Sequence, residues 1–411
     1  MHAARILVAG GSLGGLMAAN VLLRAGHDVT VLEKASASLD GRGAGIVTHR
    51  GLVTALRAAG VTVDETLGVA VASRVVLDAQ GDTVASGDHA QVLTSWSRLY
   101  ALLLAALPAE RHRRGCSVAR VDQDGQAVRV HCAGGERFEA DLLVASDGIR
   151  SAVRAQLAPA AQAEYAGYVA WRGVCDEGLL SQRTLDTLFD HFGFGLPRGE
   201  QMIGYPVAGP GNATARGQRR YNFVWYRPAD EAVELKRLMT DADGVHHAAG
   251  IPPHKVSWHE VARMREAARD LLAPQWAEVL EKTAQPFLQP IHDLMSQQLA
   301  FGRVALMGDA AFVARPHVGM GVTKAGDDAL ALCAAIAELG ATPQALQRYE
   351  SQRLPAGRAV VERGRRLGAY MQAQGGSAAE RGAAETARDA STVMRETAID
   401  LAAMRDAPVP A

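Results

Sequence analysis

Apolar and polar residues follow one another in a pattern that predicts a strand–helix–strand unit at the start of the chain. Residues 5–9 form a short apolar run, residues 16–24 have the apolar period of a helix, and residues 28–33 are apolar at every second position. Two further apolar runs, 141–146 and 303–307, are typical of strands buried on both faces. We therefore expect an α/β fold whose first domain is built on a parallel sheet.

The pattern changes after residue 165, where shorter alternating segments are separated by turns rich in proline and glycine. Strands are predicted at 168–174, 201–207 and 220–227, with a helical insertion at 257–283. These segments indicate a smaller substrate domain with an antiparallel sheet, which interrupts the first domain and is followed by C-terminal helices. The predicted boundaries are 1–72, 92–164 and 291–371 for the first domain, 73–91 (a hairpin) and 165–290 for the substrate domain, and 372–411 for a C-terminal helical tail.

Composition and charge exclude several classes of protein. The chain of 411 residues is 48% hydrophobic and 21% charged, as expected of a folded globular protein with more than one domain. A formal net charge of -1 gives no reason to expect nucleic acid or an anionic membrane as a partner. No apolar stretch reaches about eighteen residues and no secretory signal is visible, so we expect a cytoplasmic protein. The scattered cysteines predict reduced thiols and no metal site: Cys116, Cys132, Cys175 and Cys333.

A glycine-rich turn lies between the first predicted strand and its helix. It predicts a Rossmann-like dinucleotide site, because glycines allow close approach of the backbone and the helix N-terminus attracts a pyrophosphate. Glu33 ends the following strand, where a carboxylate can bind ribose hydroxyls, and Lys34 adjoins it. Ser12 replaces the middle glycine of the usual pattern, and this unit alone leaves FAD and NAD open. The turn is Gly10-Gly11-Ser12-Leu13-Gly14-Gly15.

Two later motifs separate these possibilities. Asp147-Gly148 and Gly308-Asp309 each follow a buried strand, and Gly319-Met320-Gly321 follows the second of them. In this order the three motifs resemble the single-component FAD-dependent aromatic hydroxylases (group A flavoprotein monooxygenases), over about residues 5–365. Within that family the chain is similar to the 2,6-dihydroxypyridine 3-hydroxylase branch, in residues 10–15, 45–47, 165–173, 205–206, 222–226 and 315–317. It departs from the family at Phe312 and Thr323.

The resemblance implies FAD as cofactor, NAD(P)H as electron donor and O2 as co-substrate, acting through a flavin C4a-hydroperoxide. The residues are consistent with FAD. Asp309 at a strand end can accept hydrogen bonds from ribityl hydroxyls, and the N-terminus of the helix that starts at Gly319 and Gly321 can stabilise the negative charge of a reduced flavin. Arg42 and Arg98 are candidates for pairing with phosphates or with Glu33, against the alternative of solvated surface arginines. The expected FAD residues are Gly10, Gly11, Ser12, Leu13, Gly14, Gly15, Glu33, Lys34, Arg42, Gly45, Ile46, Val47, Arg98, Asp147, Gly148, Gly308, Asp309, Gly319, Met320 and Gly321.

The substrate site is expected on the strands of the second domain. By strand alternation Gln201 and Tyr205 share one face, and Asn222 shares a face with Val224. Amide side chains both donate and accept, which suits an N-heterocycle, although ordinary sheet positions explain them equally well. Arg172 is interpreted as an anchor of its strand. Without an arginine on those faces to clamp a carboxylate, we expect a hydroxylated N-heteroaromatic ring such as a dihydroxypyridine.

The resemblance places Pro316 and His317 beside the flavin ring and the substrate. An imidazole titrates near neutrality, so His317 or its rival His49 is a candidate for deprotonating a ring hydroxyl, against the alternative that each is structural. A purine-like or phenolic ring, a flavin-fold reductase and a non-catalytic flavin-fold binding protein also remain open. The expected partner is a small aromatic molecule, and the protein is expected to be a monomer or homodimer.

Overall fold

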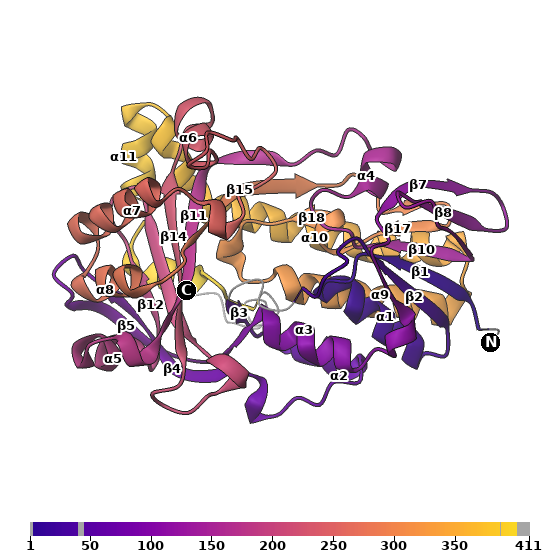
Figure 1. The fold of residues 1–411 in the computed structure, drawn as a ribbon, viewed down its shortest axis with the longest axis horizontal. Helices are drawn as coiled ribbons and strands as arrows, with labels where there is room; N and C mark the ends of the chain where they lie inside the picture. Colours follow the sequence, from indigo (N-terminus) through magenta and orange to yellow (C-terminus); the bar gives the residue numbers. More distant parts are fainter. Residues whose placement is uncertain (1–2, 40–44, 387, 401–411) are drawn as a thin grey trace, which may run out of the picture.

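The computed structural model describes residues 3–39, 45–386 and 388–400, and it consists of two sheet domains side by side (Figure 1). The first lies toward the N-terminus in this view, and the second, with longer strands, lies at the opposite end. The strands are β1 (Arg5–Ala9), β2 (Asp28–Glu33), β3 (Gly45–Val47), β4 (Val69–Leu77), β5 (Thr83–Ser95), β6 (His112–Arg114), β7 (Val118–Gln123), β8 (Val128–Cys132), β9 (Arg137–Ala140), β10 (Leu142–Ala145), β11 (Glu164–Asp176), β12 (His191–Gly195), β13 (Gln201–Val207), β14 (Arg220–Pro228), β15 (Phe287–Met295), β16 (Ala300–Phe301), β17 (Val304–Leu306) and β18 (Phe312–Val313). The α-helices are α1 (Leu13–Arg24), α2 (Arg50–Ala58), α3 (Trp96–Ala105), α4 (Ala152–Leu157), α5 (Gln182–Leu188), α6 (Lys236–Leu238), α7 (Trp258–Leu271), α8 (Pro274–Lys282), α9 (Gly321–Leu339), α10 (Pro343–Gln372), α11 (Ala378–Thr386) and α12 (Ala390–Glu396).

The first sheet confirms the expected parallel architecture. Its strand order is β16-β17-β10-β1-β2-β6, and every pair except β16–β17 is parallel. One hydrophobic core joins its strands to α1, α3 and α9 and to the three-stranded sheet β7-β8-β9. Burial of the strands on both faces explains their continuous apolar runs. The carboxyl ends of β1 and β10 therefore meet at one edge, where the glycine-rich turn and Asp147 follow them.

The second sheet has nine strands in the order β18-β15-β11-β14-β13-β12-β4-β5-β3. All three strands predicted in this domain are confirmed, and the hairpin expected at 73–91 is formed by β4 and β5, which extend beyond it. Alternate residues serve opposite faces: Phe223 and Trp225 pack under α7 and α8, whereas Val224 and Tyr226 face the first domain. The sheet thus presents a row of side chains to the interior of the molecule.

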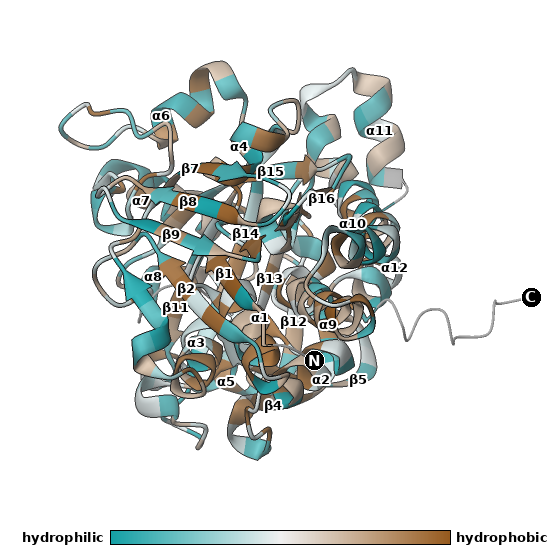
Figure 2. Cartoon of the chain, turned by 90° about the vertical axis from the view of Figure 1, so that its right-hand side faces the viewer, coloured by the Kyte–Doolittle hydropathy of each residue, from teal (hydrophilic) through white to brown (hydrophobic). Residues whose placement is uncertain are grey.

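The C-terminal helices join the two domains. Thr342 caps α10, its hydroxyl accepting from the amide of Ala345, and Pro343 is the first helical residue. The 30-residue α10 then contacts β16 of the first sheet and β11, β14 and β15 of the second. Seen from the first domain, the central strand β1 is largely hydrophobic and many of the outer turns are hydrophilic (Figure 2). Within the described residues, no helix combines the length and the apolar character that crossing a bilayer requires.

Candidate functional site

Two adjoining cavities run from the edge of the parallel sheet to the inner face of the nine-stranded sheet. The first, of about 420 Å³, is lined by the ends of β1, β2 and β10. The second, of about 340 Å³, lies between the start of α9 and the second sheet. The two share four lining residues, so they form one elongated path: Ser12, Trp96, Ser146 and Gly148.

The glycine-rich turn lies at the junction of the two cavities. Gly10 has a φ of +99°, and a Cβ there would stand 2.4 Å from the carbonyl oxygen of Ser146. A Cβ at Gly15 would stand 1.9 Å from the carbonyl oxygen of Gly10. Ser12 is the N-cap residue of α1, but in the part of the chain that the structure describes its hydroxyl makes no capping hydrogen bond. The positive end of α1 therefore points its first amides to a place where a phosphate group fits.

Two carboxylates line the first cavity. Glu33 is buried, and its oxygens accept from the amides of Gly11 (2.7 Å) and Ala35 (2.8 Å), which fixes the carboxylate at the glycine-rich turn. Each oxygen retains a second lone pair for a ribose hydroxyl. Asp147 accepts from the amide of Ala152 through Oδ2 (2.9 Å), whereas its buried Oδ1 has no partner among the described residues. Burial raises the pKa of Asp147, and an unpartnered acceptor there calls for a donor from a bound molecule. Lys34 also lines this cavity.

The Gly-Asp turn forms one wall of the second cavity. Gly308 has a φ of +59°, its amide donates to Asp328 Oδ2 (3.0 Å), and its carbonyl accepts from Lys324 Nζ (2.8 Å). Asp328 also accepts from Arg353 (2.7 Å), so a buried ion cluster holds the turn in place. Asp309 is exposed to the cavity, and desolvation by the surrounding protein raises its pKa.

Small residues make the rest of this wall. Gly319 adopts a left-handed conformation (φ +63°) two residues before α9 begins, and no atom of the described residues lies within 4 Å of a Cβ built on Gly321. The N-cap residue Met320 makes no side-chain capping bond, so the first amides of α9 remain at the cavity. Gly45 also lines the cavity: its amide donates to Asn222 Oδ1 (2.9 Å), and a Cβ there would stand 2.3 Å from the ring of Tyr205. Ile46 and Val47 follow it along the wall.

The inner face of the second sheet supplies the opposite side. Tyr205 and Tyr226 line the cavity with apolar neighbours, and Tyr205 stacks on Phe192 with ring centroids 5.0 Å apart. Neither amide predicted for the substrate lines it. Asn222 accepts from the amide of Gly45 through Oδ1, and Gln201 is buried, its Oε1 without a hydrogen-bond partner among the described residues. Of the three residues predicted to contact the substrate, Tyr205 therefore lines the cavity, and Gln201 and Asn222 lie farther along the same strand faces.

Arg172, interpreted above as a strand anchor, instead reaches the cavity together with Gln289. Arg172 Nη1 donates to Gln289 Oε1 (2.7 Å). The expectation of a cavity without an arginine considered only the strands of Gln201 and Asn222, whereas Arg172 comes from the neighbouring strand β11, opposite Val224. Arg219, which directly precedes β14, forms a buried ion pair with Glu177 (2.6 Å) and does not line the cavity.

Comparison with known proteins decides the family. The chain is 32% identical over 374 residues to 2,6-dihydroxypyridine 3-monooxygenase of Paenarthrobacter nicotinovorans, covering 91% of this chain and 92% of that protein. It belongs to the FAD-dependent aromatic monooxygenases. The structure of 2,6-dihydroxypyridine-3-hydroxylase from Arthrobacter nicotinovorans superposes with a TM-score of 0.85 at 31% identity, covering 92% of this chain and 94% of that one. A family described as FAD binding domain-like matches residues 165–293. The 6-hydroxynicotinate 3-monooxygenase of Pseudomonas fluorescens is 26% identical over 85% of this chain and 87% of its own length.

The cavities fit the cofactor of this FAD-dependent monooxygenase. The path passes first the two carboxylates of the first cavity, then the uncapped start of α1 at the junction, and then the Gly-Asp wall of the second cavity. This is the order of the ribose, the pyrophosphate and the ring in FAD. Arg98 lines neither cavity; instead, its Nη2 donates to the Thr66 hydroxyl (2.9 Å). Arg42 lies outside the described residues.

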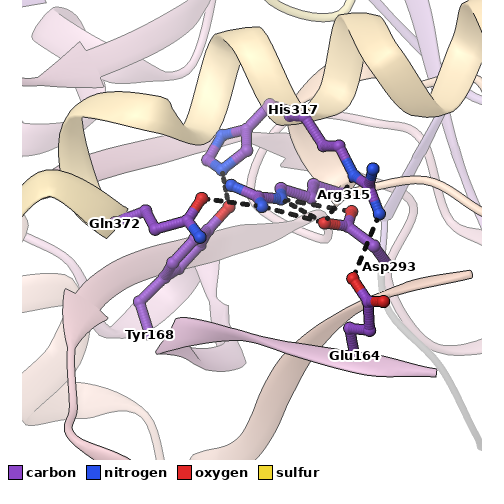
Figure 3. Close-up of polar contacts among 7 residues, drawn as sticks. Glu164, Tyr168, Asp293, Arg315, His317 and Gln372 are labelled. Carbon is purple, nitrogen blue, oxygen red and sulfur yellow. Dashed lines mark hydrogen bonds and ion pairs between the residues drawn. The ribbon is translucent and has the colours of Figure 1, made fainter.

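The two histidines considered as bases lie behind the wall of the second cavity. Pro316 lines the cavity, but the imidazole of His317 is 1% exposed, with Nε2 at 3.0 Å from the hydroxyl of Tyr168 (Figure 3). Burial, followed by the charge of Arg315, lowers the pKa of His317 to about 3. His49 donates through Nε2 to the carbonyl of Gly319 (3.1 Å), and burial lowers its pKa. This placement matches the structural alternative for both residues and brings neither ring nitrogen to the cavity.

A buried ion pair holds the same loop to the second sheet. Arg315 and Asp293 are 3% and 4% exposed, and Nη2 and Oδ2 lie 2.8 Å apart. Arg315 also donates to Gln372 on α10 (2.9 Å; Figure 3). Arg365 links Asp293 to Glu164. The loop that carries Pro316 and Gly319 is thereby fixed to β11, β15 and α10.

The C-terminal tail completes the cavity wall, a contribution that no sequence motif signalled. Thr397 and Ala398 line the second cavity, and the amide of Ala398 donates to the carbonyl of His317 (2.8 Å). The buried guanidinium of Arg74 donates to the carbonyls of Met394 (2.6 Å) and Thr397 (2.7 Å), which caps the end of α12. Burial lowers the pKa of Arg74 to about 9.

Proposed function

We propose that this chain hydroxylates a small electron-rich N-heteroaromatic ring, such as a dihydroxypyridine, with NAD(P)H as electron donor and O2 as co-substrate. The observation that supports it is the second cavity, in which the start of α9 meets an aromatic sheet face. FAD supplies the activation of oxygen when bound. The chain binds and orients the ring and excludes water.

The residues proposed to hold FAD follow the path of the two cavities. Glu33 and Asp147 accept from hydroxyls at the adenosine end, and the amides that begin α1 bind the pyrophosphate. Asp309 accepts from the ribityl chain. The amides at the start of α9 stabilise negative charge on the reduced ring, since a helix N-terminus carries a partial positive charge.

The phenols of the sheet keep their protons at neutral pH. Burial raises the pKa of Tyr205 to about 12 and raises that of Tyr226 as well. Both hydroxyl groups can therefore donate hydrogen bonds to ring oxygens, while Phe192, Ile203 and Val224 supply apolar contact around the ring.

The test is substrate-stimulated oxidation of NADH and of NADPH by the FAD-loaded protein. 2,6-Dihydroxypyridine, 4-hydroxybenzoate and urate serve as the N-heteroaromatic, phenolic and purine-like rings. We expect 2,6-dihydroxypyridine to stimulate oxidation and to yield a product heavier by one oxygen atom, labelled when 18O2 is supplied. Turnover of 4-hydroxybenzoate with oxygen incorporation, and of no hydroxypyridine, would contradict the proposal.

A further inference from the structure

Arg172 is a cation in the wall of the second cavity, and in the described part of the chain it has no carboxylate partner. Among the described residues that line this cavity it is the only cation, and Asp309 is the only carboxylate. No described Asp or Glu lies within ion-pair distance of Arg172, and its buried Nε has no hydrogen-bond partner in the described part of the chain. Within residues 3–39, 45–386 and 388–400, therefore, no carboxylate neutralises the charge of Arg172.

Strand register brings this cation to the cavity and fixes its direction. Tyr168, Ala170 and Arg172 alternate along β11 on the face that looks toward the first domain. The neighbouring strand β15 pairs Gln289 with Ala170. Gln289 accepts from Nη1 of Arg172 (2.7 Å), so the amide holds the guanidinium in place.

The surroundings make this charge attractive to an anion. Phe192, Ile203 and Val224 line the same cavity, and apolar side chains screen a charge less than water does. A guanidinium offers a planar fork of donors, which matches a carboxylate or an ionised ring oxygen. A neutral ring would leave the charge uncompensated.

We propose that Arg172, oriented by Gln289, is the anion-recognition site of the substrate cavity and selects aromatic rings that bear an ionised oxygen or a carboxylate. The inference rests on the proposed function for its substrate class. A hydroxypyridine then binds as its oxide, after its hydroxyl group has lost its proton to solvent, and the electron pair left on the oxygen enriches the ring that is to be hydroxylated.

Binding of simple probes tests this site independently of turnover. Benzoate and benzamide have nearly the same size and differ in charge, and each is titrated into the FAD-loaded protein while the flavin absorbance is followed. We expect benzoate to bind about tenfold or more tightly than benzamide to the wild-type protein, and R172Q to abolish that preference. R172K should keep part of it, because a lysine retains the charge without the planar fork.

Arg220 provides the matched control. It lies on β14 of the same sheet, pairs with Asp176 (2.7 Å) and does not line the cavity. R220Q removes one positive charge from the domain and should leave the preference for benzoate unchanged. Equal binding of benzoate and benzamide by the wild-type protein, or a preference that survives in R172Q with bound FAD intact, would overturn the proposal.

Turnover separates this inference from the proposed function. With 2,6-dihydroxypyridine, we expect R172Q to raise KM about tenfold or more and to shift the pH dependence of KM toward higher pH, where the free ring is ionised. 6-Hydroxynicotinate carries a carboxylate as well as a ring hydroxyl. If R172Q raises its KM more than that of 2,6-dihydroxypyridine, Arg172 binds the carboxylate; an equal rise indicates the ring oxide. A protein that prefers benzoate through Arg172 but hydroxylates no ring would refute the proposed function and support the anion site.

Discussion

At the scale of single residues, Asp309 bears most directly on cofactor binding. Its carboxylate faces the cavity, whereas Asp328 fixes the Gly308 turn and belongs to the ion cluster with Lys324 and Arg353. We expect D309A to weaken FAD binding about tenfold or more, because charge-assisted hydrogen bonds to the ribityl chain are lost. The measurement is the ratio of flavin to protein after gel filtration and the Kd for added FAD.

Asp327 is the appropriate control for that substitution, since it is half-buried, lines neither cavity and lies 3.9 Å from its ion-pair partner Arg353. D327N should retain FAD as the wild type does. Asp328 is unsuitable, because its removal would leave buried cations without their partner and disturb the turn itself. Full FAD occupancy in D309A would show that the carboxylate does not contact the cofactor.

His317 predicts a pH dependence of stability. Its pKa is lowered to about 3 in the folded protein, from an ordinary value of 6.5, so below pH 6.5 the unfolded chain binds a proton that the folded protein does not. The free energy of unfolding should therefore fall by up to about 1.4 kcal/mol per pH unit between pH 6 and 4 on account of this residue. Denaturant unfolding should show a shallower decline in H317N than in the wild type. Parallel declines in the two proteins would contradict this assignment.

At the scale of elements, two glycines at the start of α9 are expected to have different roles: Gly319 affects folding, and Gly321 affects cofactor binding. A Cβ at Gly319 would stand 2.8 Å from that of Ala398, in a backbone with positive φ, whereas a Cβ at Gly321 enters open space at the cavity. G319A should lower the free energy of unfolding by about 1 kcal/mol or more. G321A should leave Tm nearly unchanged but weaken FAD binding, because the added methyl group occupies the wall that the ring approaches. Tm and the Kd of FAD, measured on both variants, check the contrast.

Elements were predictable where local spacing determines them. The glycine-rich turn, Asp147 and Gly308 each follow an apolar run, and the parallel order of the strands brings their ends together. Arg172 was misplaced because its direction depends on the alternation of β11 and its contact with Gln289 on β15, 117 residues away. Trp96 lines both cavities, yet nothing in its neighbourhood of the sequence distinguishes it from an ordinary residue at the start of a helix. Such contacts depend on tertiary pairing, which a local motif does not encode.

At the scale of the whole molecule, the C-terminal tail closes a site whose other walls come from both sheets. Arg74 on β4 caps α12, and Ala398 donates to the carbonyl of His317, so the tail is fixed at two points beside the cavity. We expect R74M, and a chain shortened to end at Arg388, to open this wall and admit water. The predicted result is NAD(P)H oxidation that continues while hydroxylated product falls and H2O2 rises.

The matched control is R395Q, because Arg395 on α12 bonds only to Ser391 and Thr392 of its own helix among the described residues and does not line the cavity. Its ratio of product to NAD(P)H oxidised should equal that of the wild type. FAD content is measured in every variant. The tail lines the second cavity and not the first, so its loss should leave FAD bound. A shortened chain that retains FAD and couples every NAD(P)H to product would show that the two sheets exclude water without the tail.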